Sequence, residues 1–275
     1  MTILVAGATG NAGRQVVHEL LALGQQVRAL TRNAATARLP AGVEVVEGDL
    51  TRPETIPLDG VTGVHLLTNA GDDYAELQTG PELVLRAEKA GVRRVTVLWS
   101  GYRSPLEEAV TASSLEWTVL RPVDFMSNAL VWAESVRREG VVREPFAYAR
   151  SALVHEGDIG AVAAAVLVRG GHGGRAYTLT GPEALSVPEQ VATIGAAIGR
   201  EIEYVEQTEA EARAEMLATR PVEVVDAILG WKRDMPAQGY TVTKDVEDVL
   251  ERPARSFALW ARERAGAFLS GAGTR

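Results

Sequence analysis

Three glycines near the N-terminus, Gly7, Gly10 and Gly13, follow one another at intervals of three residues. A loop that lacks Cβ atoms can turn sharply and lets a phosphate group come close to its backbone N–H groups. The residues between these glycines are small and include Thr9, Asn11 and Ala12. This pattern is typical of a loop that binds the pyrophosphate of a dinucleotide.

The secondary-structure elements on either side of the loop determine how specific the glycine spacing is for nucleotide binding. With 27 glycines in 275 residues, the same spacing arises by chance in about a quarter of chains. Here the apolar run at residues 3–6 predicts a buried parallel strand, and the apolar residues after the loop predict a helix that ends near Gly24. A second strand is predicted at 25–30. This order favours cofactor binding over the alternative that the glycines only permit tight packing.

Arg32 follows the second predicted strand, where a protein that prefers NAD usually carries an acidic residue. No Asp or Glu occurs between residues 20 and 43, whereas Arg28, Arg32 and Arg38 do. A 2′-phosphate needs a cation there. One charge-assisted hydrogen bond of roughly 1.5–3 kcal/mol makes the affinity for NADP higher than that for NAD by about one to two orders of magnitude. The sequence therefore predicts NADP (NADPH) as the cofactor, against the alternative that Arg32 is an ordinary solvated arginine.

The ends of two later strands are expected to complete the nucleotide cleft, because ligands bind beyond the carboxyl ends of parallel strands. Asp49 and Leu50 follow the third predicted strand. Asp49 either accepts a hydrogen bond from the adenine amine or caps the next short turn. Thr68 and Asn69 follow the fourth predicted strand, and we expect them to line the cleft.

The composition excludes several kinds of site and partner. The net charge of −8 argues against nucleic acid, and the absence of cysteine excludes disulfides and thiolate chemistry. The longest apolar run, 161–168, is too short to span a bilayer, and no secretory signal is visible, so we expect a cytoplasmic protein that binds no membrane. His18 and His65 have no ligand partners at metal spacing, so no metal is predicted.

Strand and helix patterns alternate from residue 2 to about residue 120 and then give way to mostly helical patterns. We therefore expect an α/β protein with a Rossmann doubly wound parallel sheet and a smaller, mostly helical C-terminal substrate lid. The NAD(P)-binding domain is predicted at 1–125, with 151–182 returning to it, and the lid at 126–150 and 183–275. Within the lid, 141–148 is predicted to be irregular and 243–266 to be a helix broken at Pro253.

Seven stretches of the chain also resemble a known family. They are Gly-Ala-Thr-Gly-Asn-Ala-Gly-Arg at 7–14, Val-Arg-Ala-Leu-Thr-Arg at 27–32, Gly-Asp-Leu at 48–50, Leu-Glu-Trp-Thr-Val-Leu-Arg-Pro at 115–122, Phe-Met-Ser-Asn at 125–128, Asp-Ile-Gly-Ala-Val-Ala at 158–163 and Arg-Pro-Ala-Arg-Ser-Phe at 252–257. In them the chain resembles the atypical short-chain dehydrogenase/reductase superfamily and, within it, the NmrA-like group of NAD(P)-binding proteins. The resemblance covers nearly the whole chain but is not specific to one reaction.

The chain departs from the superfamily at the residues that usually transfer the proton. Its carbonyl reductases use Tyr-x-x-x-Lys, in which the tyrosine is the donor, but here Leu106 stands four residues after Tyr102. Tyr240 and Lys244 match the spacing but fall after the nucleotide domain is complete, so we interpret that match as a coincidence.

A rough alignment places Arg103 near the lysine position, where it would hold ribose or phosphate. The remaining candidate donors are Ser100, Tyr102 and His155. Each also has a purely structural alternative. In these alternatives Ser100 caps the end of a strand, Tyr102 forms a wall of the cleft, and His155 is a loop histidine whose hydrogen bonds are satisfied.

The resemblance implies an NADPH-dependent oxidoreductase that transfers hydride to a small carbonyl, enone or quinone. Because a quinone needs less help with protonation than a ketone, the missing pair favours conjugated acceptors. The same absence fits a second hypothesis, an NADP(H)-binding redox sensor without turnover, whereas a sugar-nucleotide epimerase or dehydratase is disfavoured because it needs the pair. The expected partner is a small-molecule substrate, and a homodimer is left open. Lid aromatics either stack on a flat substrate or form core: Phe125, Trp132, Phe146, Tyr148 and Trp231.

Overall fold

The computed structural model of the chain describes residues 1–70, 75–101 and 103–269. The chain divides into two compact units, each built from three separate segments. The first unit comprises Met1–Pro122, Glu156–Leu179 and Lys244–Pro253. The second unit comprises Val123–His155, Thr180–Thr243 and Ala254–Arg275.

A parallel sheet forms the centre of the first unit. Within the described residues it has seven strands in the order β11-β8-β7-β4-β1-β2-β3, and every neighbouring pair is parallel. This order, which reverses between β1 and β4, confirms the predicted doubly wound Rossmann fold. The strands are β1 (Thr2–Val5), β2 (Gln26–Thr31), β3 (Glu44–Glu47), β4 (Val61–Leu67), β7 (Arg94–Leu98), β8 (Glu116–Pro122) and β11 (Arg175–Leu179).

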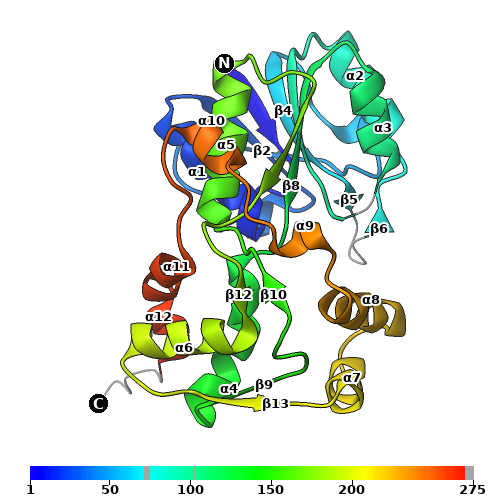
Figure 1. The fold of residues 1–275 in the computed structure, drawn as a ribbon. Helices are drawn as coiled ribbons and strands as arrows, with labels where there is room; N and C mark the ends of the chain where they lie inside the picture. Colours follow the sequence, from blue (N-terminus) through cyan, green and yellow to red (C-terminus); the bar gives the residue numbers. More distant parts are fainter. Residues whose placement is uncertain (71–74, 102, 270–275) are drawn as a thin grey trace. The chain divides into compact units, whose positions relative to one another are not determined.

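Helices cover both faces of this sheet (Figure 1). Helices α1 (Asn11–Ala22) and α5 (Glu156–Arg169) pack against each other on one face, and α2 (Gly80–Lys89) and α3 (Pro105–Ala112) lie on the other. The α1–α5 contact is close because Gly160 has no side chain, and a Cβ atom there would lie 2.5 Å from the backbone carbon of Gln15. Short elements connect the strands: η1 (Ala34–Thr36), η2 (Pro53–Thr55), β5 (Asn69–Ala70) and β6 (Ala75–Glu76).

Helix α10 (Asp245–Leu250) belongs to the first unit, whereas the sequence predicts this segment in the lid. Two polar contacts hold it there. The backbone N–H of Thr178 in β11 donates to Asp245 Oδ2 at 2.6 Å, and Arg252 donates to the buried Asp158 of α5 at 2.7 Å. Both contacts join residues that are far apart in the chain, so the local helical pattern of the segment does not reveal them.

The second unit combines helices with two small sheets. Strand β9 (Val141–Glu144) pairs in parallel with β13 (Glu203–Glu206), and β10 (Arg150–Ser151) pairs with β12 (Leu185–Ser186) in antiparallel fashion. Three buried aromatic rings in its core, Phe257, Trp260 and Phe268, lie against one another. The helices are η3 (Met126–Trp132), α4 (Ala133–Arg138), α6 (Val187–Ile198), α7 (Glu209–Leu217), α8 (Val222–Arg233), α9 (Ala237–Tyr240), α11 (Phe257–Glu263) and α12 (Ala265–Phe268).

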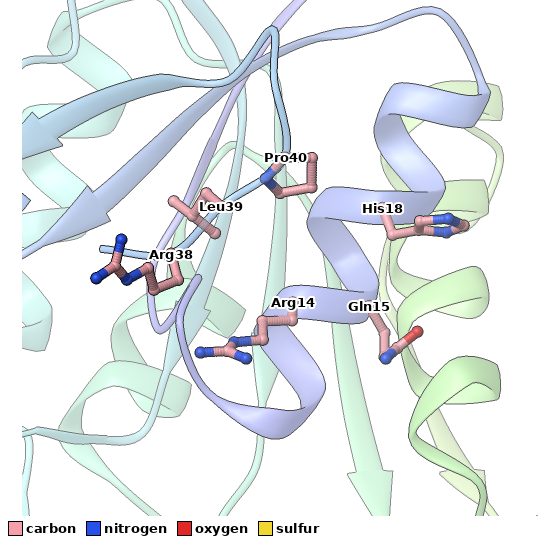
Figure 2. A pocket seen from close by; sticks show the side chains of 6 residues that line it. All are labelled: Arg14, Gln15, His18, Arg38, Leu39 and Pro40. Atoms are coloured by element: carbon pink, nitrogen blue, oxygen red, sulfur yellow. The ribbon is translucent and has the colours of Figure 1, made fainter. Parts of the chain in front are cut away.

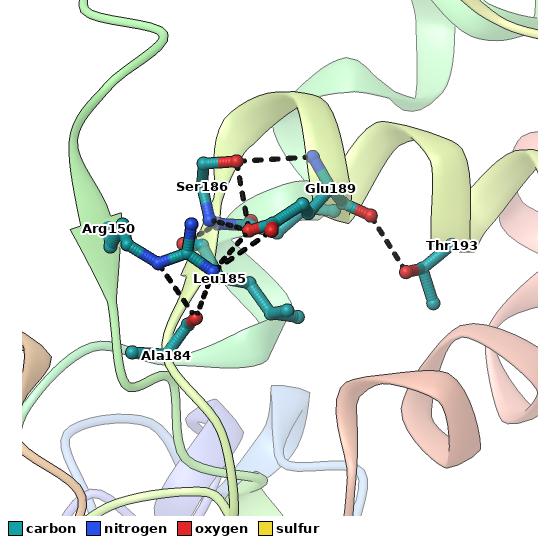
Figure 3. A network of polar contacts seen from close by, with 7 residues as sticks. Arg150, Ala184, Leu185, Ser186, Glu189 and Thr193 are labelled. Carbon is teal, nitrogen blue, oxygen red and sulfur yellow. Dashed lines mark hydrogen bonds and ion pairs between the residues drawn. The ribbon is translucent and has the colours of Figure 1, made fainter.

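A polar network fixes the start of α6 (Figure 3). Ser186 caps the helix, since its hydroxyl accepts from the backbone N–H of Glu189 while the Glu189 carboxylate accepts from the backbone N–H of Ser186 at 2.7 Å. Arg150 of β10 donates to the Ala184 carbonyl at 2.9 Å and pairs with Glu189 at 2.7 Å. The network therefore joins the β10–β12 sheet to α6.

One local prediction for the lid is wrong and another is confirmed. The segment 141–148 is not wholly irregular, because residues 141–144 pair with β13 some sixty positions later in the chain. The segment 243–266 is helical with a break that includes Pro253, as predicted: Glu251 ends α10 in a left-handed conformation (φ 56°), and Ser256 caps α11. Over the described ranges, no helix is both long and apolar enough to cross a membrane.

Candidate functional site

The glycine loop between β1 and α1 has a shape that requires two of its glycines. Gly7 has φ 62°, a conformation that L side chains rarely adopt, and a Cβ atom there would lie 2.6 Å from Leu67 Cδ1. A Cβ atom on Gly13 would overlap the carbonyl oxygen of Gly7. Gly10 closes the turn, since its backbone N–H donates to that same oxygen at 2.9 Å. The loop therefore doubles back tightly onto the end of β1.

The N-terminus of α1 has no side-chain cap, because its capping residue is Gly10. No acidic residue occurs in the first turn. Thr9, Gly10 and Asn11 are exposed, whereas Ala12 and Gly13 are buried against the loop. Backbone N–H groups and the positive end of the helix dipole at such an uncapped terminus attract anions. These residues fit the pyrophosphate of a dinucleotide.

Arg32 and Asp49 lie at the ends of the neighbouring strands β2 and β3. Arg32 is exposed. Asp49 Oδ1 accepts from the backbone N–H of Thr51 at 2.9 Å and from its hydroxyl at 2.8 Å. These hydrogen bonds, together with the charges of Arg52 and Arg32, lower the pKa of Asp49. Asp49 thus performs the turn-capping role that the sequence offered as one alternative, while its contact with adenine stays a prediction, as does that of the buried Leu50.

A cationic recess of about 490 Å³ lies beside α1 (Figure 2). Its side chains come from α1 and the loop before β3: Arg14, Gln15, His18, Arg38, Leu39 and Pro40. Arg14 Nε donates to the carbonyl of Thr9 at 2.8 Å, which holds its guanidinium at the glycine loop. Figure 2 shows the guanidinium groups of Arg14 and Arg38 on the same side of α1, with His18 and Gln15 turned to the other side. None of the described residues that line the recess carries a carboxylate.

Thr68 and Ser100 meet at the carboxyl ends of the adjacent strands β4 and β7. Thr68 is fully buried, and its hydroxyl donates to Ser100 Oγ at 2.7 Å. In return the backbone N–H of Ser100 donates to Thr68 Oγ1 at 2.9 Å. Ser100 itself is exposed, so the pair presents one accessible hydroxyl at the edge of the sheet. Asn69, the first residue of β5, is half-buried beside Thr68.

Arg103 and His155 each contact a glutamate. Arg103 is exposed and forms an ion pair with Glu108 at 2.9 Å. His155 belongs to the second unit, where it is buried and its Nε2 lies 3.0 Å from Glu263 Oε2. Tyr102 lies outside the described residues. Of the two candidate donors within the described residues, Ser100 lies at the carboxyl end of a strand of the main sheet and His155 does not.

The sequence model of the NmrA-like family matches residues 1–233. The chain belongs to the NmrA-like family. This membership confirms the predicted resemblance, and it accounts for the glycine loop and parallel sheet as parts of a shared NAD(P)-binding fold.

Two relatives match this NmrA-like protein over nearly its full length. It is 36% identical to the (4-alkanoyl-5-oxo-2,5-dihydrofuran-3-yl)methyl phosphate reductase of Streptomyces griseus, over 97% of this chain and 99% of that protein. It is 34% identical to the NAD(P)H azoreductase of Xenophilus azovorans, and the match covers 97% of this chain and 99% of that protein. Both relatives are named as reductases, which supports an oxidoreductase function.

A solved structure shows the same fold. The Citrobacter sp. triphenylmethane reductase complexed with NADP(H) has a TM-score of 0.80 and 21% identity to this NmrA-like protein, and the match covers 96% of this chain and 100% of that one. The names of that structure and of the Xenophilus azovorans relative give NADP(H) and NAD(P)H for those two proteins.

The lid aromatics of the NmrA-like protein differ in exposure. Trp132 is buried, and Phe125 and Phe146 are half-buried. Tyr148 and Trp231 expose 66% and 40% of their surface. Phe146 adopts φ 61°, which is unusual for a bulky residue, and its ring meets that of Tyr148 edge-on at 6.0 Å. The exposed rings, rather than Trp132, are therefore available to a flat ligand.

Sequence reasoning missed Asp124 of this NmrA-like protein, which lies two residues after β8. Its Oδ1 accepts from Asn128 Nδ2 at 2.6 Å and from the backbone N–H of Phe125 at 2.9 Å. Ser151 Oγ donates to Oδ2 at 3.3 Å. Burial raises the pKa of Asp124, against the opposing effects of these bonds and of the Lys232 charge. The signal available in the sequence was a carboxyl residue two positions after Pro122, beyond the carboxyl end of a strand.

A second polar group of the NmrA-like protein surrounds Glu144, a buried residue at the end of β9. Its carboxylate accepts from Trp132 Nε1 at 2.8 Å and pairs with Lys232 Nζ at 2.6 Å. The backbone carbonyl of Glu144 accepts from the Tyr204 hydroxyl at 2.9 Å. The cluster thus joins η3, β9, β13 and α8. In the part of the chain that the structure describes, no group of three or more His, Asp or Glu side chains is arranged to bind a metal.

Proposed function

We propose that the protein is an NADPH-dependent reductase that transfers hydride to a conjugated acceptor, such as an enone or a quinone. The observation that carries the proposal is the tight glycine loop before the uncapped N-terminus of α1. NADPH bound at this loop supplies the hydride. The pyrophosphate-binding residues in this proposal are Gly7, Thr9, Gly10, Asn11, Ala12 and Gly13.

The cation at the end of β2 supports selection of NADPH over NADH. Arg32 stands where an acidic residue would favour the ribose hydroxyls of NAD. The recess of Arg14 and Arg38 adds two further guanidinium groups and no carboxylate. Guanidinium groups bind phosphate through several N–H donors at once, so these residues serve a 2′-phosphate.

The names of the two relatives support conjugated acceptors. The Streptomyces griseus protein is named for a ring in which a carbon–carbon double bond is conjugated with carbonyl groups, and the Xenophilus azovorans protein is named for azo compounds. Such acceptors take hydride at one end of a π system, and the charge that develops is delocalised. They depend less on a strong acid than an isolated ketone does, which agrees with the lack of a lysine four residues after Tyr102.

Ser100 is suited to support the developing negative charge. Because Ser100 Oγ accepts the proton of Thr68, its own proton is directed away from that bond. The hydroxyl is exposed at the carboxyl end of β7, where α/β sheets bind ligands. Ser100 therefore donates a hydrogen bond to the oxygen of the acceptor, with Thr68 holding it in place.

An acceptor panel tests this function. NADPH oxidation is followed by absorbance with quinones, enones, azo compounds and simple aldehydes, and with the Gly10→Val variant as a control for the nucleotide site. We expect the conjugated acceptors to react fastest and the variant to be inactive with all of them. No turnover with any acceptor, combined with tight binding that differs between NADP⁺ and NADPH, would overturn the reductase and favour a redox sensor.

A further inference from the structure

Arg121 is the penultimate residue of β8, and its guanidinium joins two parts of the first unit. Its Nη2 donates to Oε1 of Glu107 in α3 at 2.6 Å, and its central carbon lies 5.5 Å from the centre of the Trp99 ring. Trp99 directly precedes Ser100. We propose that Arg121 is a positioning residue for the reaction, which holds the end of β7 through Trp99 and so directs the hydroxyl of Ser100. The inference rests on the proposed reductase function and adds a residue that acts through Ser100.

The register of β7 and β8 places Trp99 and Arg121 side by side. Leu98 of β7 pairs with Leu120 of β8, and the backbone N–H of Trp99 donates to the Leu120 carbonyl at 2.9 Å. Trp99 and Arg121 are the next residue along each chain segment, so their side chains leave the same face of the sheet. A guanidinium within about 6 Å of an indole centre is attracted to the face of the ring. The stacked contact therefore follows from the pairing of the two strands.

Glu107 holds the guanidinium from the direction of α3. It is buried in the first turn of this helix, where its backbone N–H donates to the hydroxyl oxygen of Ser104 at 3.2 Å. Among the described residues, the bond from Nη2 to Glu107 is the one hydrogen bond of the guanidinium, and Nε is buried without a partner. A guanidinium with one hydrogen bond can still turn about it. The ring of Trp99 is therefore the second contact, which fixes the plane of the group.

Ser100 is held from both neighbouring strands. On the side of β4, Thr68 bonds to its hydroxyl and to its backbone N–H. On the side of β8, the residue before it is hydrogen-bonded to Leu120 and stacked against Arg121. Thr68 thus sets the direction of the hydroxyl, and Arg121 sets the position of the backbone that carries it. A shift of a reacting group by about 1 Å lowers rates by about 100-fold, so this position matters for the chemistry.

The Arg121→Lys variant separates the stacked contact from the charge. Lysine keeps a cation for the buried Glu107 but has no planar group to lie over Trp99. We expect kcat with a quinone to fall about ten-fold, while KM and the NADPH dissociation constant change less than about two-fold. Trp99→Leu should give the same loss, and Trp99→Phe, which keeps a ring, should restore most of the wild-type rate. Wild-type kcat in both Arg121→Lys and Trp99→Leu would overturn the inference.

A matched control lies at the amino ends of the same two strands. There Arg94 of β7 forms an ion pair with Glu116 of β8 at 2.9 Å. Arg94→Lys should lower the urea unfolding midpoint as Arg121→Lys does, yet leave kcat within about two-fold, because ligands bind at the opposite edge of the sheet. An equal fall of kcat in Arg94→Lys would show that the rate follows the stability of the β7–β8 pairing, and this would contradict a positioning role.

A double-mutant cycle tests whether Arg121 acts through Ser100. In the Ser100→Ala protein the hydroxyl that Arg121 directs is already gone. We therefore expect Arg121→Lys to lower kcat less than about two-fold in that background, against about ten-fold in the wild type. Losses that multiply to about 100-fold in the double variant would show that the two residues act independently, and this would overturn the inference.

Hydrogen exchange of the Ser100 amide supplies a readout that needs no turnover. This N–H donates to Thr68 Oγ1, so its exchange rate, followed by NMR, reports how firmly Ser100 is held. We expect Arg121→Lys and Trp99→Leu to raise that rate about ten-fold, while the amide of the buried Val97 in β7 stays unchanged. An unchanged Ser100 amide would overturn the positioning role. A wild-type protein that reduces no acceptor but shows this exchange effect would instead overturn the reductase function.

Discussion

The hydroxyl of Thr68 donates to Ser100 Oγ at 2.7 Å, while the backbone N–H of Ser100 donates to Thr68 Oγ1 at 2.9 Å. The two residues follow adjacent parallel strands, so this reciprocal pair ties the carboxyl ends of β4 and β7 together. One member is fully buried and the other is exposed. The buried hydroxyl therefore fixes the direction in which the exposed one donates.

Removal of either hydroxyl should lower catalysis with little effect on cofactor affinity. We expect Ser100→Ala and Thr68→Val each to lower kcat/KM for a quinone about ten-fold, which corresponds to one hydrogen bond of about 1.4 kcal/mol. Steady-state kinetics and an NADPH fluorescence titration separate the two effects. Thr68→Ser retains the hydroxyl and should retain the rate. Full activity in Ser100→Ala would remove Ser100 from the site.

Two of the loop glycines, Gly10 and Gly13, should respond differently to substitution. Gly13→Ala places a methyl on the Gly7 carbonyl, so we expect both lost NADPH binding and a destabilisation of about 1–3 kcal/mol from overpacking. Gly10 has φ −82° and more room, so Gly10→Val should fold while its methyls block the pyrophosphate. Calorimetry and chemical unfolding measure both quantities. Gly230→Ala, which meets no atom within 4 Å, should leave both nearly unchanged.

Arg32 and the cationic recess should together determine the choice between NADPH and NADH. We expect Arg32→Ala and Arg38→Ala each to weaken NADPH binding about ten-fold or more while NADH binding stays within two-fold, because only NADPH carries the 2′-phosphate. Adenosine 2′,5′-bisphosphate should lose affinity in parallel. Arg86→Ala, on α2, is the matched control. An equal loss for NADPH and NADH would contradict a 2′-phosphate role for these arginines.

The parts of the fold that local patterns determine could be predicted from the sequence. The glycine loop is one of them, because the turn, the uncapped helix and the strand before it all depend on residues 3–22. The position of Arg32 could be predicted in the same way, because this residue directly follows the second strand in the sequence. For Asp49 the sequence offers two alternatives, a hydrogen bond with adenine and the capping of a turn. The hydrogen bonds from Thr51 show that Asp49 caps the turn.

The remaining features depend on partners that are distant in the chain. Asp124 draws its environment from Ser151 and Lys232, and no local pattern around residue 124 signals them. Strand β9 exists because it pairs with β13. The return of α10 to the first unit depends on the contact of Asp245 with Thr178 and on a second contact between Arg252 and Asp158. Such contacts follow from the complete fold, which a single sequence does not display.

His65 should make the protein less stable at mildly acidic pH. It is fully buried in β4, and burial lowers its pKa from 6.5 to about 4. Between these values the unfolded chain binds the proton and the folded chain does not, so the free energy of unfolding falls as the pH falls from about 6.5 to about 4. The whole loss approaches about 3 kcal/mol. Urea unfolding at several pH values measures it.

The His65→Gln variant isolates this effect from the other titrating groups. In the wild type, Nδ1 of the His65 ring lies 2.8 Å from Thr96 Oγ1, and the side-chain amide of glutamine can replace this contact. We expect the variant to be less stable than the wild type at pH 7.5 but to lose less stability on acidification. The difference between the two curves is the contribution of His65. Parallel curves would show that another group causes the pH dependence.

The ion pair between Lys232 and the buried Glu144 should be worth far more than an exposed pair. Lys232→Met leaves the Glu144 carboxylate buried with only Trp132 as a partner, so we expect a loss of about 2–4 kcal/mol in chemical unfolding. Arg138→Ala breaks an exposed i,i+4 pair and should cost at most about 0.5 kcal/mol. The double variant Lys232→Met with Glu144→Gln should recover part of the loss, because no buried charge is then left without a counter-ion. A Lys232→Met cost no larger than that of Arg138→Ala would mean that water reaches Glu144 and that the second unit does not depend on this pair.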